Sequence, residues 1–188
     1  MKQISDYRIL AATAERQAEI KKFVLAMMSS LYPKGSYHED PYDLAHFDDV
    51  YVRPANARFF IAVSADGATI GTASVKPYDR RFPEVESSIG NWPVCEVGKF
   101  YIHPSRRRQG VGSRLYRHAE RFAREAGYGE SYLHTSLYLP GGYPFWQSRG
   151  YIERYWESEQ VVHMSKRWTE AETGEDLVSE DQSSNSFT

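Results

Sequence analysis

The 188-residue chain lacks most features that mark secreted, metal-binding or membrane-spanning proteins. Its single cysteine, Cys95, excludes an internal disulfide and a metal site built from several cysteines, so we expect no metal and a cytoplasmic setting. The longest apolar run, FVLAMMSSLY, has about half of the roughly 20 residues that a membrane span needs. The N-terminal MKQISDYRILAATAERQ has no apolar segment typical of a signal peptide, and we expect none.

An excess of charge of one sign is also missing. The 23 Lys and Arg residues against 25 Asp and Glu residues give a formal net charge of -2, whereas a dedicated nucleic-acid-binding domain is usually basic. We therefore expect neither nucleic acid nor a membrane as a partner. Hydrophobic residues make up 41% of the chain, enough for one domain, which we place over 1–168. The polar, acidic residues 169–188 are predicted to form a flexible tail.

Hydrophobic periodicity predicts an α/β chain. Apolar residues at three- and four-residue spacing indicate helices over 14–31 and over about 110–126. Asp66-Gly67 between two runs rich in β-formers predicts a hairpin over 58–77. The remaining elements are strands predicted at 7–10, 94–102, 131–137 and 160–168, short helices at 44–52 and between Pro144 and Gly150, and a loop over 78–92.

The most informative stretch is HPSRRRQGVGSRLYRH, residues 103–118. It separates the predicted strand 94–102 from a helix that leads to the strand 131–137. Such a crossover makes the two strands parallel, so the loop lies at a helix N-terminus, where backbone N–H groups attract anions. Gly110 and Gly112 allow a phosphate to approach the backbone closely, and the neighbouring arginines add charge-assisted hydrogen bonds.

The glycine spacing distinguishes this loop from other phosphate-binding loops. A Walker loop needs Gly-Lys-Ser/Thr, which is absent, and the dinucleotide fingerprint needs a third glycine where this chain has Leu115. The loop instead reads Arg-x-x-Gly-x-Gly over 107–112, which resembles the acyl-CoA signature of the GNAT superfamily of N-acetyltransferases. The segments CEVGKFYIHP, PFWQSRGY and VVHMSKRW are similar to three further family motifs, in the same order, over residues 7–168.

The resemblance implies the GNAT fold, a mixed, mostly antiparallel sheet flanked by helices, with a parallel strand pair splayed at the cofactor site. It implies acetyl-CoA as co-substrate and direct transfer of its acetyl group to a primary amine in a ternary complex. The loop amides would hold the pyrophosphate, Arg106 or Arg108 the 3′-phosphate, and one strand backbone the pantetheine arm. The cofactor-binding residues implied are Phe100, Tyr101, Ile102, Arg107, Arg108, Gln109, Gly110, Val111, Gly112, Ser113 and Trp146.

Acetyl transfer to an amine needs a proton acceptor, hydrogen-bond donors for the oxyanion and a stabilised leaving thiolate. Glu96 is the first candidate for the base, because it lies where many family members carry an acidic residue on the fourth strand; a salt-bridged strand glutamate is the alternative. His134 is the second candidate, because the ordinary pKa of histidine suits proton transfer, although a lone histidine is more often structural.

The residue that would protonate the thiolate is less clear, because Trp146 replaces the tyrosine of the family motif. An indole N–H does not readily give up its proton, so Trp146 is expected to pack against the cofactor arm or the core. Tyr143, three residues earlier, Tyr138, and a mechanism without a dedicated acid are the alternatives. Cys95 neighbours Glu96 on the strand and should therefore point to the opposite face as a buried thiol.

The segment YPKGSYHEDPYDLAHFDD is acidic and aromatic. It is interpreted either as a pocket for a cationic small-molecule or peptide amine, or as a solvated loop. Two other functions remain open: a non-catalytic acyl-CoA-binding sensor, and a nucleic-acid or phosphoprotein binder that uses Arg106 to Arg108, which the net charge disfavours. A homodimer is compatible with the sequence but is not indicated by it.

Overall fold

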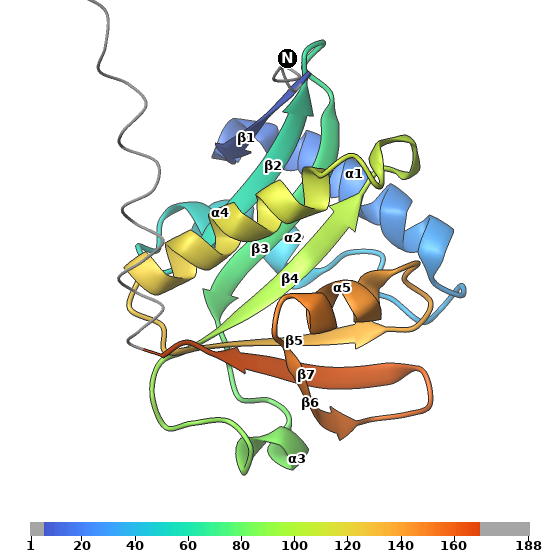
Figure 1. Cartoon of the computed structure of the whole chain (residues 1–188). Helices are drawn as coiled ribbons and strands as arrows, with labels where there is room; N and C mark the ends of the chain where they lie inside the picture. The colour runs from blue at the N-terminus through green and yellow to red at the C-terminus, as the bar shows by residue number, and fades with distance from the viewer. Residues whose placement is uncertain (1–5, 170–188) are drawn as a thin grey trace, which may run out of the picture.

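The computed structural model describes residues 6–169 (Figure 1), so the predicted tail from residue 170 onward lies outside the described part. A seven-stranded sheet forms its centre, in the order β1-β2-β3-β4-β5-β7-β6. The strands are β1 (Tyr7–Ala11), β2 (Arg58–Ser64), β3 (Thr69–Pro77), β4 (Val94–Ile102), β5 (Glu130–Ser136), β6 (Ile152–Trp156) and β7 (Val161–Arg167). The helices are α1 (Gln17–Leu31), α2 (Tyr42–Ala45), α3 (Pro83–Glu86), α4 (Val111–Glu125) and α5 (Gly142–Ser148).

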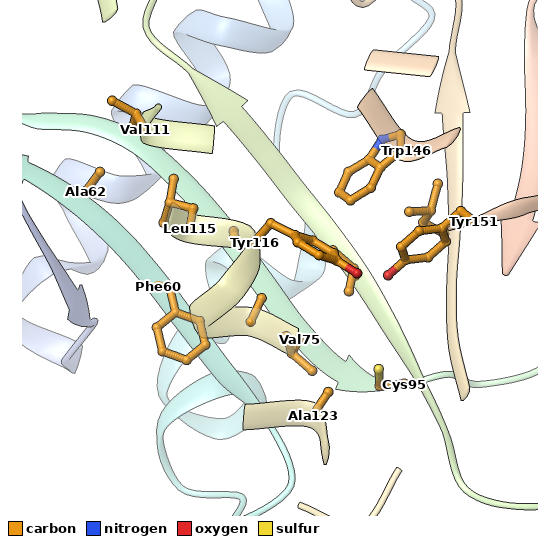
Figure 2. Packing of buried hydrophobic residues seen from close by; sticks show 14 of the residues in the cluster. Phe60, Ala62, Val75, Cys95, Val111, Leu115, Tyr116, Ala123, Trp146 and Tyr151 are labelled. Atoms are coloured by element: carbon orange, nitrogen blue, oxygen red, sulfur yellow. The ribbon is translucent and has the colours of Figure 1, made fainter. Parts of the chain in front are cut away.

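Helices cover both faces of this sheet, with α4 and α5 on one face and α1 and α2 on the other (Figure 1). The alternation of side chains along β2 supplies both layers. Phe59 and Ile61 pack in the core beneath α1, whereas Phe60 and Ala62 pack with Leu115 of α4 (Figure 2). Burying each large apolar side chain contributes roughly 1.5–3 kcal/mol, so both faces of β2 hold the layers together.

Among the described strands, β4 and β5 form the one parallel pair, and all other neighbouring strands are antiparallel. This arrangement confirms the mixed α/β fold expected from the sequence. The parallel pairing covers Val94–Glu96 against Glu130–Tyr132 and then stops. Beyond it the strands fan apart, as the V between β4 and β5 in Figure 1 shows.

A bulge in β4 lies directly after the point of divergence. Between Thr72 and Ser74 of β3 the register shifts, because β4 carries one extra residue there. Lys99 adopts a left-handed φ of 45°, and its carbonyl accepts a hydrogen bond from the Thr72 hydroxyl at 2.6 Å. Bulges of this kind bend a strand and re-aim its side chains. The bulge therefore turns the second half of β4 away from β5.

Three local expectations differ from the structure. Strand β6 was not predicted, because an edge strand pairs on one side and IERYW shows no buried alternation. The loop predicted over 78–92 contains the short helix α3. Helix α5 begins at Gly142, so Pro144 is its third residue rather than near its first. No helix within residues 6–169 combines the length and the apolar character that crossing a membrane requires.

Candidate active site

A cavity of about 1680 Å³ occupies the splay between β4 and β5. Its wall combines the C-terminal part of α1, the segment 36–43, the glycine loop before α4, and α5. Most residues predicted from the sequence contribute to it. They are Glu96, Phe100, Tyr101, Ile102, Arg107, Arg108, Gly110, Gly112, Ser113, His134 and Trp146.

Gln109 and Val111 belong to the predicted loop but do not line the cavity with their side chains. The Val111 side chain is buried in the core with Leu115. The Gln109 side-chain amide donates to the Ser105 carbonyl at 2.8 Å and so closes the loop on itself. Both residues support the loop structurally, and what they can offer a ligand is their backbone.

The loop before α4 has a shape suited to an anion. Arg108 and Gly110 both have left-handed backbones, with φ of 61° and 81°, and Gly110 is the N-cap of the 15-residue α4. Gly110 has no side chain that could cap this helix start, and a Cβ added there would meet nothing within 4 Å. The first N–H groups of a long helix attract negative charge, so this helix start can hold a phosphate.

Two buried polar atoms in the cavity wall have no hydrogen-bond partner within the described part of the chain, namely Arg149 Nε and Thr135 Oγ1. Arg149 follows α5; its Nη2 donates to Ser113 Oγ at 2.6 Å, and its guanidinium lies over the Phe145 ring. A buried polar atom without a partner costs about 1–3 kcal/mol, which a bound ligand would recover. These donors suit phosphate and amide oxygens, and sequence reasoning missed both residues.

Trp146 forms part of the inner wall. Its indole is buried, and its ring centroid lies 4.8 Å from Phe100 and 5.4 Å from Tyr151. Figure 2 shows the indole above the rings of Tyr116 and Tyr151. Cys95 is buried in the same core, as predicted, and burial raises the pKa of its thiol to about 12. The thiol is therefore protonated at neutral pH and does not act as a nucleophile.

Glu96 lies where β4 and β5 begin to diverge, and its side chain is almost completely buried. Arg81 binds its carboxylate through both terminal nitrogens, at 2.9 and 2.5 Å, and Lys76 Nζ lies 3.4 Å away. Burial raises the pKa of Glu96. The hydrogen bonds from Arg81 and the positive charges of Lys76 and Arg81 lower it by more, so the net shift is downward. Glu96 is consequently a firmly ionised carboxylate and a weak proton acceptor.

Sequence reasoning did not find Arg81, which comes from the connection between β3 and β4. The preceding residue, Arg80, has a left-handed φ of 55°, and its side chain donates to Glu86 at 2.8 Å and to the Gly90 carbonyl at 2.6 Å. These bonds clamp the connection to itself while Arg81 turns toward Glu96. Arg81 is thus held as a fixed part of the site.

His134 of β5 lies beside Glu96, with 3.9 Å between Nδ1 and the nearer carboxylate oxygen. The structure therefore brings the two predicted base candidates together. The ring also contacts Phe82 and His163, at centroid distances of 5.9 and 5.8 Å. Burial lowers the pKa of His134 and outweighs the opposing effect of Glu96, so the net shift is downward. His134 is therefore neutral at pH 7 and can accept a proton.

Replacing Glu96 with glutamine should destabilise the fold. We expect Glu96→Gln to lower the free energy of unfolding by about 2 kcal/mol at pH 7, because it leaves Arg81 without its buried counter-charge. Urea denaturation would measure the loss, with the exposed Glu84→Gln as matched control. Because folding lowers the pKa of Glu96, the difference should be complete above about pH 4.3 and shrink as the pH falls below that value. Equal stability of both variants would contradict the ion pair.

The chain also matches a known protein family over most of its length. A model of the Acetyltransferase (GNAT) family matches residues 22–151, more than half of the chain. The chain belongs to the GNAT family. The match includes the glycine loop, the splayed strand pair and α5, which are therefore parts of a GNAT domain. The GNAT resemblance inferred from the sequence motifs is confirmed.

Known acetyltransferases resemble the chain in sequence and in structure. Aminoglycoside N(6')-acetyltransferase type 1 of Klebsiella aerogenes is 37% identical over 116 residues, which are 60% of this chain and 70% of that protein. A GNAT acetyltransferase from Staphylococcus aureus Mu50 superposes with a TM-score of 0.70 at 14% identity, covering 87% of this chain and 99% of its own. A GNAT acetyltransferase from Brucella melitensis, solved in complex with acetyl-CoA, superposes with a TM-score of 0.60 at 16% sequence identity. The match covers 87% of this chain and 88% of that protein.

The predicted acid Tyr143 lies outside the GNAT cavity lining. Its hydroxyl donates to Glu153 and accepts a hydrogen bond from Gln147 at 2.9 Å. Helix α5 begins at Gly142, so Pro144 is its third residue and Tyr143 its second. The sequence left this start of the helix uncertain. Tyr138, the other tyrosine considered, lines the cavity and is 47% exposed.

These positions predict different effects for two conservative substitutions. We expect Tyr143→Phe to leave kcat within about twofold of wild type, and Tyr138→Phe to lower it roughly tenfold, because Tyr138 alone of the two lines the cavity in which the thiolate would form. Steady-state thiol release would measure both. An equal loss of kcat in the two variants would show that lining the cavity does not identify the residue that protonates the thiolate. Full activity in both would favour transfer without a dedicated acid.

Proposed function

We propose that the protein moves the acetyl group of acetyl-CoA to a primary amine of a small molecule or peptide, by direct transfer in a ternary complex. One observation carries the proposal: a single cavity joins the start of α4 at Gly110 to a carboxylate–imidazole pair. Membership in the acetyltransferase family and the acetyl-CoA complex of a structural neighbour support it.

The donors described above fit the cofactor. The N–H groups around Gly110 and the side chains of Arg107, Arg108 and Arg149 would hold the phosphates. Thr135 and the unpaired edge of β4 would bind the amide groups of the pantetheine arm. When bound, acetyl-CoA supplies a thioester, whose carbonyl carbon is open to attack by a neutral amine. The backbone N–H groups near the bulge in β4 would stabilise the developing oxyanion.

His134 is the residue that we propose as proton acceptor. Its Nδ1 faces Glu96, which leaves Nε2 to take a proton from the ammonium group of the acceptor. The ionised Glu96, held by Arg81, would stabilise the imidazolium that forms. Glu96 is therefore a positioning residue in this proposal rather than the base, since its ion pair makes it a poor proton acceptor.

The acceptor enters over the acidic, aromatic segment in this proposal. Asp40 and Asp43 of that segment line the cavity together with Tyr32 and Tyr37, whereas Glu39 does not. The aromatic faces suit a cationic amine, whereas Lys21 and Lys99 pair with the two carboxylates. The name of the Klebsiella relative extends the candidates to aminoglycosides.

The proposal is tested by acetyl-CoA-dependent thiol release with a panel of aminoglycosides, polyamines, lysine peptides and monoamines. We expect at least one amine to stimulate release and to be recovered with one added acetyl group by mass spectrometry. Tight acetyl-CoA binding without turnover of any amine would instead support the non-catalytic sensor. Salt-sensitive oligonucleotide binding that acetyl-CoA does not compete would support the nucleic-acid alternative.

A further inference from the structure

The carboxylates that line the cavity differ in how their charge is balanced. Within the described residues, three of the four have a Lys or Arg nitrogen in salt-bridge range. The pairs are Asp40 with Lys21 at 2.6 Å, Asp43 with Lys99 at 3.0 Å, and Glu96 with Arg81 at 2.5 Å. The fourth, Glu157, has no Lys or Arg partner in the described part, and its side chain is 52% exposed. It is the cavity carboxylate whose charge remains available.

Glu157 is nevertheless held in place, in the turn between β6 and β7. Its Oε2 lies 3.1 Å from Nε2 of His163, and Nδ1 of His163 lies 2.6 Å from the Tyr132 hydroxyl. Tyr132 and His163 are both fully buried. A hydroxyl that donates to Nδ1 leaves Nε2 to donate to Glu157. The buried pair thus orients the carboxylate, which has no Lys or Arg nitrogen in salt-bridge range among the described residues.

This carboxylate lies close to the proposed base. His134 of β5 and His163 of β7 are direct partners in the sheet, with ring centroids 5.8 Å apart. Phe82 packs against both rings, at 5.9 and 4.6 Å. Glu157 also acts electrostatically on His134. An amine reacting at His134 would therefore have Glu157 within reach of another part of the same molecule.

We propose that Glu157 binds a second cationic group of the acceptor, so that the site selects diamines, polyamines and amino sugars with several amino groups over monoamines. This inference rests on the proposed function, because the first amino group is the one acetylated. The reacting amine must be neutral, whereas a second ammonium can stay charged and pair with an oriented carboxylate in a concave site, one that has no Lys or Arg partner within residues 6–169.

Binding to the protein in the presence of coenzyme A tests the inference without requiring turnover. Calorimetry at pH 8 would compare 1,4-diaminobutane and kanamycin with 1-aminobutane. We expect the wild type to bind at least one of the polycations more tightly than the monoamine. Glu157→Gln should raise the Kd for that polycation about five- to tenfold and leave the monoamine unchanged, and Glu157→Asp should lie between.

Glu159→Gln is the matched control, since Glu159 lies in the same turn and is exposed but does not line the cavity. It removes the same charge and should leave every Kd at the wild-type value. Equal Kd values for polycation and monoamine, or equal effects of the Glu157 and Glu159 variants, would overturn the inference. Thiol release separates it from the proposed function: a Glu157-dependent Kd without acetyl transfer would refute the reaction alone, and transfer with an unchanged Kd would refute the second-cation site alone.

Discussion

Gly110→Asp is expected to raise the dissociation constant for acetyl-CoA about 100-fold, which corresponds to roughly 2.7 kcal/mol. Gly110 is the N-cap of α4 and lines the cavity. A carboxylate at this position would direct its negative charge at the N–H groups proposed to hold the pyrophosphate. The left-handed φ of 81° adds a backbone cost of about 1 kcal/mol for any residue with a Cβ. Isothermal titration calorimetry with acetyl-CoA would measure the change.

Gly127→Asp separates the charge effect from the backbone effect. Gly127 has nearly the same φ, 85°, and likewise nothing within 4 Å of an added Cβ, but it follows the C-terminal end of α4 and does not line the cavity. Both variants carry the same backbone cost, but the helix dipole favours an aspartate at the start of α4 and disfavours one after its end, so Gly110→Asp should lose less stability than Gly127→Asp. The Gly110 variant alone should lose acetyl-CoA affinity. Unchanged affinity of Gly110→Asp would show that the loop does not bind the cofactor.

His134→Gln is expected to lower kcat about 100- to 1000-fold at saturating amine and acetyl-CoA, because it removes the proposed proton acceptor. The wild-type kcat should fall as the pH drops through the pKa of His134, since the protonated ring cannot accept a proton. Because burial lowers that pKa, this fall should be centred below about pH 6.5. The variant should lose this acid limb, which a pH profile of kcat would reveal.

His46→Gln is the control for this substitution. His46 stacks on Tyr42 with centroids 4.0 Å apart and does not line the cavity, so its replacement should leave both kcat and the pH profile unchanged. A His134 variant with full kcat, together with a folded Glu96→Gln protein that has lost activity, would transfer the role of base to Glu96. That outcome would restore the first interpretation of the sequence.

The features predicted correctly from the sequence are those that depend on residues close together in the chain. The hairpin around Asp66-Gly67 follows from local turn chemistry, and its strands, 58–64 and 69–77, are those expected. The phosphate loop follows from glycine spacing between a strand and an amphipathic helix. The position of Cys95 opposite Glu96 follows from the alternation of side chains along a strand.

The residues that the sequence did not predict come together through long-range packing. Arg81 reaches Glu96 from a connection outside the sheet, and Arg149 reaches Ser113 across 36 positions. No local pattern encodes such contacts, because they depend on how separate elements pack. The exclusion of Tyr143 similarly depends on where α5 begins.

By itself, the sequence determined the fold class, the family resemblance and the place where a phosphate-rich cofactor can bind, because turn geometry, periodicity and helix-start chemistry act over a few residues. Only the tertiary structure decided which carboxylates have a Lys or Arg partner for their charge. Glu96 and Glu157 are the same residue type in the sequence. In the fold, Arg81 forms an ion pair with Glu96, whereas the buried His163 orients Glu157. The pKa and the binding capacity of a side chain depend on the groups that folding places around it, and those groups come from distant parts of the chain.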